Sequence, residues 1–387
     1  MGKTILILAD GTCFSGLGFG ALAPSVKQLL SSSYTNMPVG ELVFNTSMGA
    51  YHEIITDPSY AGQSIVMTAP HIGNYGLNRS WNEMQFALPV CKSIIVRDLY
   101  TGAIPLGRES LETLARKWNL CGMTDVDTRA LTLHIRQKGS QYGVVIAACD
   151  LTQEEVKQVI QWLIACPPMQ ERDFISSCTV EKPQFYPPEG NVKRRFALWD
   201  FGFKQSIVKQ LQQRGVAVTV FPAVMPLSQI LTQECNFDAL LISNGPGDPA
   251  TLGGAVDQLR GFLGTIPLLG ICLGHQLLAL ALGGKTEKML FGHHGSNHPV
   301  RDLQRNKVYV TAQNHGYCVL PDSLPPSATM WLVNNNDKTL EGFYDLTHTV
   351  MAVQFHPEAA PGPWEARQLF DTFIQFSHLN KESSDAS

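Results

Sequence analysis

Cys272, a cysteine with a glycine two residues away on either side, is the residue of this 387-residue chain whose surroundings most favour nucleophilic chemistry. Apolar residues up to Ile271 indicate a buried strand, and residues 277–282, closed by Gly283-Gly284, indicate a helix. Cys272 is therefore expected at a sharp strand-to-helix turn, where the free N–H groups of the helix stabilise a thiolate and a nearby oxyanion. The alternative is a small core residue, the usual role of a buried free cysteine.

A histidine and a glutamate follow another predicted strand, residues 350–355. His356 and Glu358 are two positions apart, so on an extended chain their side chains point to the same face. An imidazole that deprotonates a thiol needs its other nitrogen oriented by an acceptor, and Glu358 can supply one. We therefore predict Cys272, His356 and Glu358 as the catalytic residues. For the His-x-Glu pair considered alone, a surface histidine beside an exposed glutamate is the alternative.

A glycine-containing loop, residues 243–249, follows a third predicted strand and reads Ser-Asn-Gly-Pro-Gly-Asp-Pro. Its glycines let the backbone approach a ligand closely and turn N–H groups inward. We expect the N–H groups of Gly247 and Leu273 to form an oxyanion hole for a tetrahedral intermediate. Taken alone, the loop would be an ordinary turn.

Strands and helices alternate regularly in the segment that must position these residues. The predicted elements are strand 196–200, helix 204–214, strand 217–221, helix 227–233, strand 239–243 and helix 255–263. This alternation implies right-handed crossovers and an α/β fold with a doubly wound, mostly parallel sheet. Ligands bind such sheets beyond the carboxyl ends of the strands, where Cys272 and the loop 243–249 both lie.

The amino-terminal part has a different pattern and is predicted as a separate mixed α/β domain. Asp10-Gly11 separates two short β-rich runs, and residues 110–117 and 127–138 have helical spacing. Thr152 and Glu155 form a capping box that predicts the start of another helix.

A stretch rich in proline and poor in apolar residues separates the two patterns and is predicted as a linker. The predicted boundaries are 1–178 for the amino-terminal domain, 179–195 for the linker, 196–380 for the carboxyl-terminal domain and 381–387 for a tail.

The composition is that of a folded globular protein, with 44% hydrophobic and 16% charged residues and a net charge of −4. This charge gives no electrostatic footprint for nucleic acid or an anionic membrane. Nine cysteines without Cys-x-x-Cys spacing predict neither a disulfide framework nor a zinc ribbon, so we expect a reducing, cytoplasmic setting. Residues 266–284 are long enough to span a membrane, but Pro267, four glycines and His275-Gln276 favour a buried strand-turn-helix.

Neither a metal site nor a nucleotide site is predicted in this chain. Four histidines lie in two clusters, His293, His294, His298 and His315. They lack cysteines or carboxylates at ligand spacing, so hydrogen-bonded loop histidines are the favoured interpretation. Gly283-Gly284-Lys285-Thr286 has the ending of a phosphate loop, but Ala279 occupies the position of its leading glycine.

The catalytic residues and the loop 243–249 together resemble the class I glutamine amidotransferases, which use a Cys-His-Glu triad. Motifs along nearly the whole chain resemble more specifically the small, glutamine-hydrolysing chains of carbamoyl phosphate synthetase. These motifs are residues 44–48, 56–60, 70–74, 127–129, 243–249, 270–276, 291–299, 313–316 and 354–358. The amino-terminal motifs carry the finer resemblance, because other amidotransferases of the class lack this leading domain.

This resemblance implies that Cys272 attacks the side-chain amide of L-glutamine, that His356 transfers the proton, and that Glu358 orients His356. A glutamyl thioester and ammonia form, and water then releases glutamate. The resemblance also implies a set of glutamine-binding residues: Ser59, Gly245, Gly247, Leu273, Gln276, Asn314, Gly316 and Tyr317.

The implied partner is a large chain that binds ATP and its metal ion and makes carbamoyl phosphate from bicarbonate, for arginine or pyrimidine biosynthesis. We expect a heterodimer or a higher oligomer, with no cofactor in this chain. The alternatives are a stand-alone thiol amide hydrolase on the same fold and a non-catalytic regulatory homologue.

Two departures from the family pattern bear on these alternatives. Residues 48–53 read Met-Gly-Ala-Tyr-His-Glu where the family commonly has Met-Thr-Gly-Tyr-Gln-Glu, and Tyr317 stands where phenylalanine is usual. The first departure changes a loop near the predicted domain junction and keeps the non-catalytic alternative open. The second is chemically mild.

Overall fold

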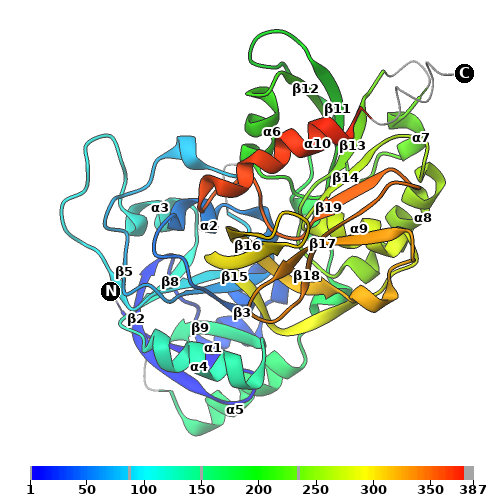
Figure 1. Ribbon diagram of the computed structural model, residues 1–387. Coiled ribbons are helices and arrows are strands. Elements are labelled where there is room, and N and C mark those ends of the chain that lie inside the picture. Colours follow the sequence, from blue (N-terminus) through cyan, green and yellow to red (C-terminus); the bar gives the residue numbers. More distant parts are fainter. Residues whose placement is uncertain (1, 86–88, 149–150, 233–235, 379–387) are drawn as a thin grey trace, which may run out of the picture. The chain divides into compact units, whose positions relative to one another are not determined.

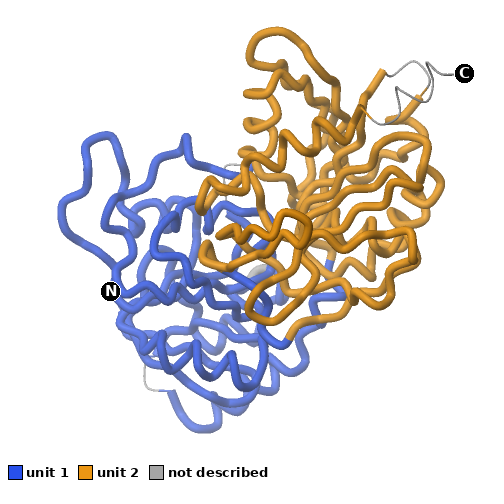
Figure 2. Tube along the Cα trace, in the orientation of Figure 1, with its two compact units in different colours: residues 1–172, 290–294 blue, residues 173–289, 295–387 orange. Residues whose placement is uncertain are grey.

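The computed structural model describes residues 2–85, 89–148, 151–232 and 236–378. The chain forms two compact units (Figure 2): unit 1 holds residues 1–172 and 290–294, and unit 2 holds residues 173–289 and 295–387. Two of the nine cysteines, Cys149 and Cys235, lie outside the described residues, as does the predicted tail 381–387.

Unit 1 is built on a closed sheet of seven described strands. In spatial order these are β1 (Lys3–Leu8), β2 (Cys13–Gly20), β8 (Cys121–Thr124), β6 (Ser93–Ile95), β4 (Gln63–Met67), β3 (Val39–Asn45) and β9 (Tyr142–Ala147), which returns to β1. The pairs β3–β4, β4–β6 and β6–β8 are parallel, and the others are antiparallel. Apolar side chains such as Leu6, Leu42 and Val66 pack in one buried cluster of this sheet. The sequence predicted the β1–β2 hairpin but not the closure.

Four of the five described helices of unit 1 begin at a side-chain cap, and the one that follows Ala50 does not. They are α1 (Val26–Leu30), α2 (Tyr51–Ile55), α3 (Leu111–Lys117), α4 (Thr128–Lys138) and α5 (Gln153–Ile164). Ser110 accepts from the N–H of Thr113 at the start of α3, and Thr152 and Glu155 form the predicted capping box of α5. The helices predicted over 110–117, 127–138 and from Thr152 are thereby confirmed.

Unit 2 contains a ten-stranded sheet whose central strands are parallel. The order is β10 (Gln184–Tyr186), β12 (Val216–Pro222), β11 (Arg194–Asp200), β13 (Ala239–Ile242), β14 (Leu268–Ile271), β19 (Val350–Val353), β18 (Leu340–Asp345), β17 (Ala328–Asn334), β15 (Thr286–Asp302) and β16 (Lys307–Val319). Strands β12, β11, β13, β14 and β19 run parallel, and β10 and β18 flank them antiparallel. The parallel part is the predicted doubly wound sheet.

Helices cover both faces of this parallel part (Figure 1). One face carries α6 (Gln205–Gln212) and α10 (Leu369–Phe376), and the other carries α7 (Leu227–Ile230), α8 (Gly253–Phe262) and α9 (Leu273–Ala281). Successive strand residues alternate between the faces: Leu198 and Leu241 pack with α6 and α10, whereas Ala197 and Leu240 pack with α8 and α9. This two-sided burial accounts for the nearly continuous apolar runs of the strands.

The segment 179–195, predicted as a linker, contributes β10 to this sheet. Phe185 and Tyr186 pair antiparallel with Thr219 and Val218 of β12. Such a short run between prolines gives too little periodicity to be recognised as a strand. The segment 266–284 folds as β14, a turn and α9, and within the described residues no helix has the length and apolar character needed to cross a membrane.

Ala50, in the loop that departs from the family pattern, has left-handed backbone angles (φ 59°, ψ 32°) at the start of α2. A side chain is disfavoured in this conformation, which glycine adopts freely. We expect Ala50→Gly to raise the free energy of unfolding by about 0.5–1 kcal/mol, measured by urea denaturation. Ala130→Gly, on the exposed surface of α4, is the matched control and should lower it by about 1 kcal/mol. A loss of stability in both variants would contradict the assignment of strain to Ala50.

Candidate active site

Cys272 lies at the predicted turn between β14 and α9, with φ 55° and ψ −103°. The glycines on either side are required by close contacts. A Cβ at Gly270 would lie 2.6 Å from the Gly274 carbonyl carbon, and one at Gly274 would lie 2.2 Å from Ile242 O. The Cys272 N–H donates to Val353 O at 2.9 Å, which fixes the turn to the neighbouring strand β19. The predicted strand-turn-helix is confirmed.

His356 and Glu358 follow β19 and lie beside this turn. His356 Nδ1 is 2.7 Å from Glu358 Oε1, and both side chains are buried. The Cys272 side chain lies close enough to the imidazole to raise the pKa of His356, and its thiol donates to Asn314 O. With Nδ1 held by Glu358, Nε2 is the nitrogen available to the thiol. Cys272, His356 and Glu358 therefore have the connectivity that a thiol, its base and an orienting carboxylate require.

Lys204 is a member of this cluster that the sequence analysis missed. Its Nζ lies 2.9 Å from Glu358 Oε1 and also donates to Ala360 O, and the side chain is 1% exposed. The available signal was its position just after the predicted strand 196–200, since residues at that edge of a doubly wound sheet lie near the ligand site. The ammonium gives the buried Glu358 carboxylate a second cationic neighbour.

These buried charges stabilise one another. Burial alone would raise the pKa of Glu358, but Lys204 and His356 lower it to about 2. Burial alone would lower the pKa of His356, but the Glu358 carboxylate and Cys272 together raise it to about 10. The contribution of Glu358 to stability is therefore complete above its ordinary pKa and lost as the pH falls through about 2. That of His356 is complete below its ordinary pKa and lost as the pH rises through about 10. His356 and Glu358 therefore stay ionised at neutral pH.

The glycine loop after β13 lies against the start of α9. The Gly274 N–H donates to Ser243 O at 3.1 Å, which ties the loop to the helix. A Cβ at Gly245 would lie 2.8 Å from Leu273 Cδ2, so this glycine permits close packing. Gly247 has φ 96° and faces open space, and Leu273 is the first residue of α9, whose N–H has no partner within the helix. The loop and helix can thus supply the two predicted oxyanion donors.

Two hydrogen bonds connect the predicted glutamine-binding residues of β16 to Cys272 and to α9. Asn314 O is 3.5 Å from Cys272 Sγ, and Gln276 Nε2 donates to Tyr317 O at 2.9 Å. Gln276 Nε2 also donates to Gln354 Oε1 at 3.1 Å. Both amide hydrogens of Gln276 are thereby used, so its carbonyl oxygen can serve a ligand as an acceptor, for example of the α-ammonium group of glutamine.

Two further predicted binders differ in their surroundings. Gly316 has nothing within 4 Å of the position a Cβ would take, as expected of a backbone that a ligand approaches. Ser59 belongs to unit 1, where its N–H donates to Asp57 Oδ1 at 2.9 Å in the short helix η2 (Pro58–Tyr60). Its assignment to the glutamine site stays a prediction.

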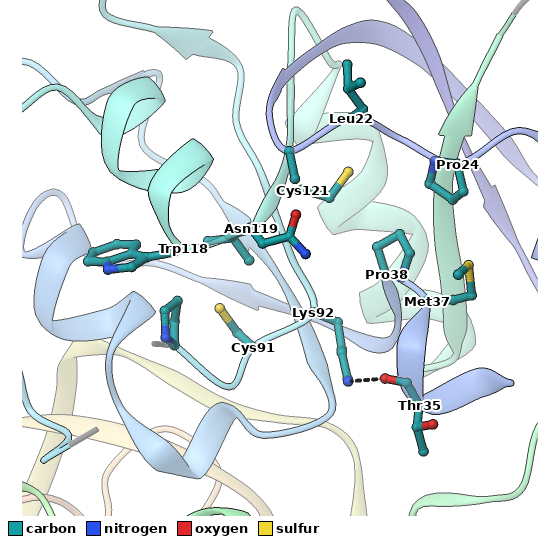
Figure 3. A pocket seen from close by; sticks show the side chains of 13 residues that line it. Leu22, Pro24, Thr35, Met37, Pro38, Cys91, Lys92, Trp118, Asn119 and Cys121 are labelled. Atoms are coloured by element: carbon teal, nitrogen blue, oxygen red, sulfur yellow. Dashed lines mark hydrogen bonds between the residues drawn. The ribbon is translucent and has the colours of Figure 1, made fainter. Parts of the chain in front are cut away.

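Unit 1 contains a pocket of about 240 Å³ that could be mistaken for a second reactive site (Figure 3). Cys91 and Cys121 line it, and burial raises the pKa of both thiols to about 12. Lys92 is held by donation to Thr35 O at 3.1 Å, and the lining residues include no histidine or carboxylate. Thiols of this kind stay protonated at neutral pH and are poor nucleophiles.

Comparison with known proteins identifies two sequence families in this chain. The family "Glutamine amidotransferase class-I" matches residues 197–376, and "Carbamoyl-phosphate synthase small chain, CPSase domain" matches residues 6–145.

Proteins described as carbamoyl phosphate synthase small chain match over nearly their whole length. That of Methanococcus maripaludis is 40% identical over 377 residues, covering 96% of each chain. That of Clostridium perfringens is 40% identical over 377 residues, covering 97% of this chain and 99% of the relative. That of Salmonella typhimurium is 39% identical over 398 residues, covering 99% of each.

Proposed function

Because this chain belongs to the carbamoyl phosphate synthase small-chain family and is the glutamine-hydrolysing subunit of the synthase, we propose that it works through a Cys272 thioester and supplies ammonia to a large chain. The observation that carries the proposal is the buried chain of contacts from Cys272 through His356 and Glu358 to Lys204. Burying charged groups such as these costs free energy, and their arrangement is suited to holding a thiolate–imidazolium pair.

In the proposed reaction the Cys272 thiolate attacks the side-chain amide carbon of glutamine. The Gly247 and Leu273 N–H groups stabilise the resulting oxyanion. His356, which holds the proton from the thiol, gives it to the leaving nitrogen, and ammonia departs as the thioester forms. His356 then takes a proton from water, and the hydroxide attacks the thioester carbon. The C–S bond breaks, glutamate is released, and the Cys272 thiolate is restored beside the protonated His356. Glu358 keeps the imidazole oriented through both steps.

The large chain is needed because this sequence has no recognisable phosphate loop with which to activate bicarbonate. ATP and its metal ion would bind to that partner, which would convert the ammonia to carbamoyl phosphate for arginine or pyrimidine biosynthesis. Ammonia released into water is protonated at neutral pH and loses its nucleophilic lone pair, so an enclosed passage between the chains is expected. The seven described cysteines are free, which supports a reducing, cytoplasmic setting.

We expect the isolated chain to hydrolyse glutamine slowly, and to accelerate when the large chain turns over ATP and bicarbonate. The measurement is glutamate release, with and without the large chain and each of its substrates. Ammonium-dependent carbamoyl phosphate formation by the complex is the control for an active partner. Carbamoyl phosphate formation from glutamine by this chain alone would contradict the partner requirement, and fast hydrolysis of other amides without the partner would favour a stand-alone hydrolase.

A further inference from the structure

Asp200 is a buried carboxylate that the proposed reaction does not use. It ends β11, is fully buried, and accepts three backbone hydrogen bonds. Its Oδ1 accepts from the N–H groups of Gly202 and Phe203, both at 2.8 Å, and its Oδ2 accepts from that of Val180 at 2.7 Å. Burial raises the pKa of Asp200 to about 6, although these hydrogen bonds oppose the increase. The carboxylate is therefore largely ionised at neutral pH in a place where its charge is costly.

The carboxylate shapes the turn that carries Lys204. Two of its three hydrogen bonds close the turn 201–204 on itself, and Gly202 has φ 121° within this turn. On its other side the turn is bound to the glycine loop. The Lys204 N–H donates to Asn244 Oδ1 at 3.1 Å, and Asn244 Nδ2 donates to Gly202 O at 2.9 Å. A Cβ at Gly245 would lie 2.4 Å from Phe201 O, so the turn and the loop are in close contact.

The third hydrogen bond ties the turn 201–204 to residues 179–180, which precede strand β10. Val180 donates to the Asp200 carboxylate, and Thr179 Oγ1 donates to Asp200 O at 2.7 Å and accepts from the Ala223 N–H at 2.9 Å. From Asp200 a continuous set of contacts then leads through the turn to Lys204 and Glu358. Displacing the turn would move the Lys204 ammonium away from Glu358.

We propose that Asp200 is a positioning residue of the active site: it fixes the turn 201–204 and so holds Lys204 on Glu358. The inference rests on the proposed glutaminase function. Asp200 acts through Lys204 and touches neither Cys272 nor His356 in the contacts described above. Its effect on catalysis should therefore depend on the presence of Lys204.

The test is a double-mutant cycle with Asp200→Asn and Lys204→Met, measured as glutamine hydrolysis by the complex with the large chain. Asp200→Asn keeps the shape of the side chain but removes one acceptor and the charge. We expect it to lower kcat/KM roughly 10–100-fold, the size of effect that a small misplacement of catalytic groups produces. The double variant should be no more than about threefold below Lys204→Met, because the two residues act in series.

Asp238→Asn is the matched control. Asp238 Oδ2 accepts from the Arg195 N–H at 2.8 Å near the opposite end of β11, so this variant should keep activity within about twofold. Ammonium-dependent carbamoyl phosphate formation reports an active large chain, and co-elution of the two chains in size-exclusion chromatography reports that each complex is assembled. If Asp200→Asn fails to fold, Thr179→Val in the same cycle removes the hydroxyl that donates to Asp200 O, and it should again be non-additive with Lys204→Met.

Full activity of Asp200→Asn, or a loss that adds to that of Lys204→Met, would overturn the inference and leave the glutaminase function intact. Absence of glutamine hydrolysis in the wild-type complex would instead overturn the proposed function. The two failures are therefore distinguishable in one set of measurements.

Discussion

Cys272→Ser is expected to abolish glutamine hydrolysis while the complex with the large chain continues to make carbamoyl phosphate from ammonium. Serine fits the turn at φ 55°, but its hydroxyl is far less ionised than a thiol beside the same imidazole. Loss of a nucleophile from a triad lowers kcat by roughly 10⁴–10⁶-fold. The ammonium reaction should stay within about twofold of wild type, because the nucleophile takes no part in using ammonia.

Cys13→Ser is the matched control for this prediction. Cys13 is an exposed thiol of unit 1 whose pKa is raised by burial of the sulfur and by Asp10. Its replacement should leave both the glutamine-dependent and the ammonium-dependent reactions unchanged. Retained glutamine hydrolysis in Cys272→Ser, or loss of the ammonium reaction together with the glutamine reaction, would contradict the separation of the two activities.

Replacing the two other members of the triad should have unequal effects. His356→Asn removes the group that transfers the proton and should lower kcat by about 10⁵-fold or more, whereas Glu358→Gln should lower it by roughly 10³–10⁴-fold. Glu358 orients the imidazole and favours its charged form, and neither role includes accepting the proton. Equal losses in the two variants, or an unaffected Glu358→Gln, would contradict this division of roles.

Glu358→Gln has a second expected effect, on stability. The change leaves the buried Lys204 ammonium without its carboxylate, and breaking a buried ion pair costs about 3–5 kcal/mol. Adding Lys204→Met should restore much of the lost stability without restoring activity. Thermal unfolding measured beside kcat separates the effect on stability from the effect on activity. Recovery of activity in the double variant would show that Glu358→Gln lost activity only because the Lys204 ammonium had no carboxylate partner.

The sequence predicted those parts of the site that depend on local patterns. The turn at Cys272 follows from a strand, two glycines and a helix within one short segment. The pairing of His356 with Glu358 was predicted from an extended chain, but β19 ends at Val353 and a turn at residues 357–358 brings the two side chains together. The glycine loop was recognisable because it directly follows a strand. In each case the neighbours that decide the geometry are also neighbours in the sequence.

The parts that the sequence analysis missed depend on contacts between distant segments. Lys204 acquires Glu358 as a partner only when β11 and β19 join the same sheet, and Asp200 accepts one hydrogen bond from Val180, 20 residues away. Each residue alone is an ordinary charged group beside a strand. The closure of the unit 1 sheet through the β1–β9 pair and the strand β10 likewise depend on long-range pairing. Strand propensity is strongly context-dependent, so such pairings cannot be read from short segments.

The measurement that tests the account most directly is peptide mapping after treatment with a chloromethyl ketone analogue of glutamine. We expect the label on Cys272, with protection by excess glutamine. Burial raises the pKa of Cys91, Cys121, Cys166 and Cys318 to about 12, so these thiols should react little at neutral pH. A glutamine-protected label on another cysteine, with Cys272 unmodified, would contradict the assignment of Cys272 as the nucleophile.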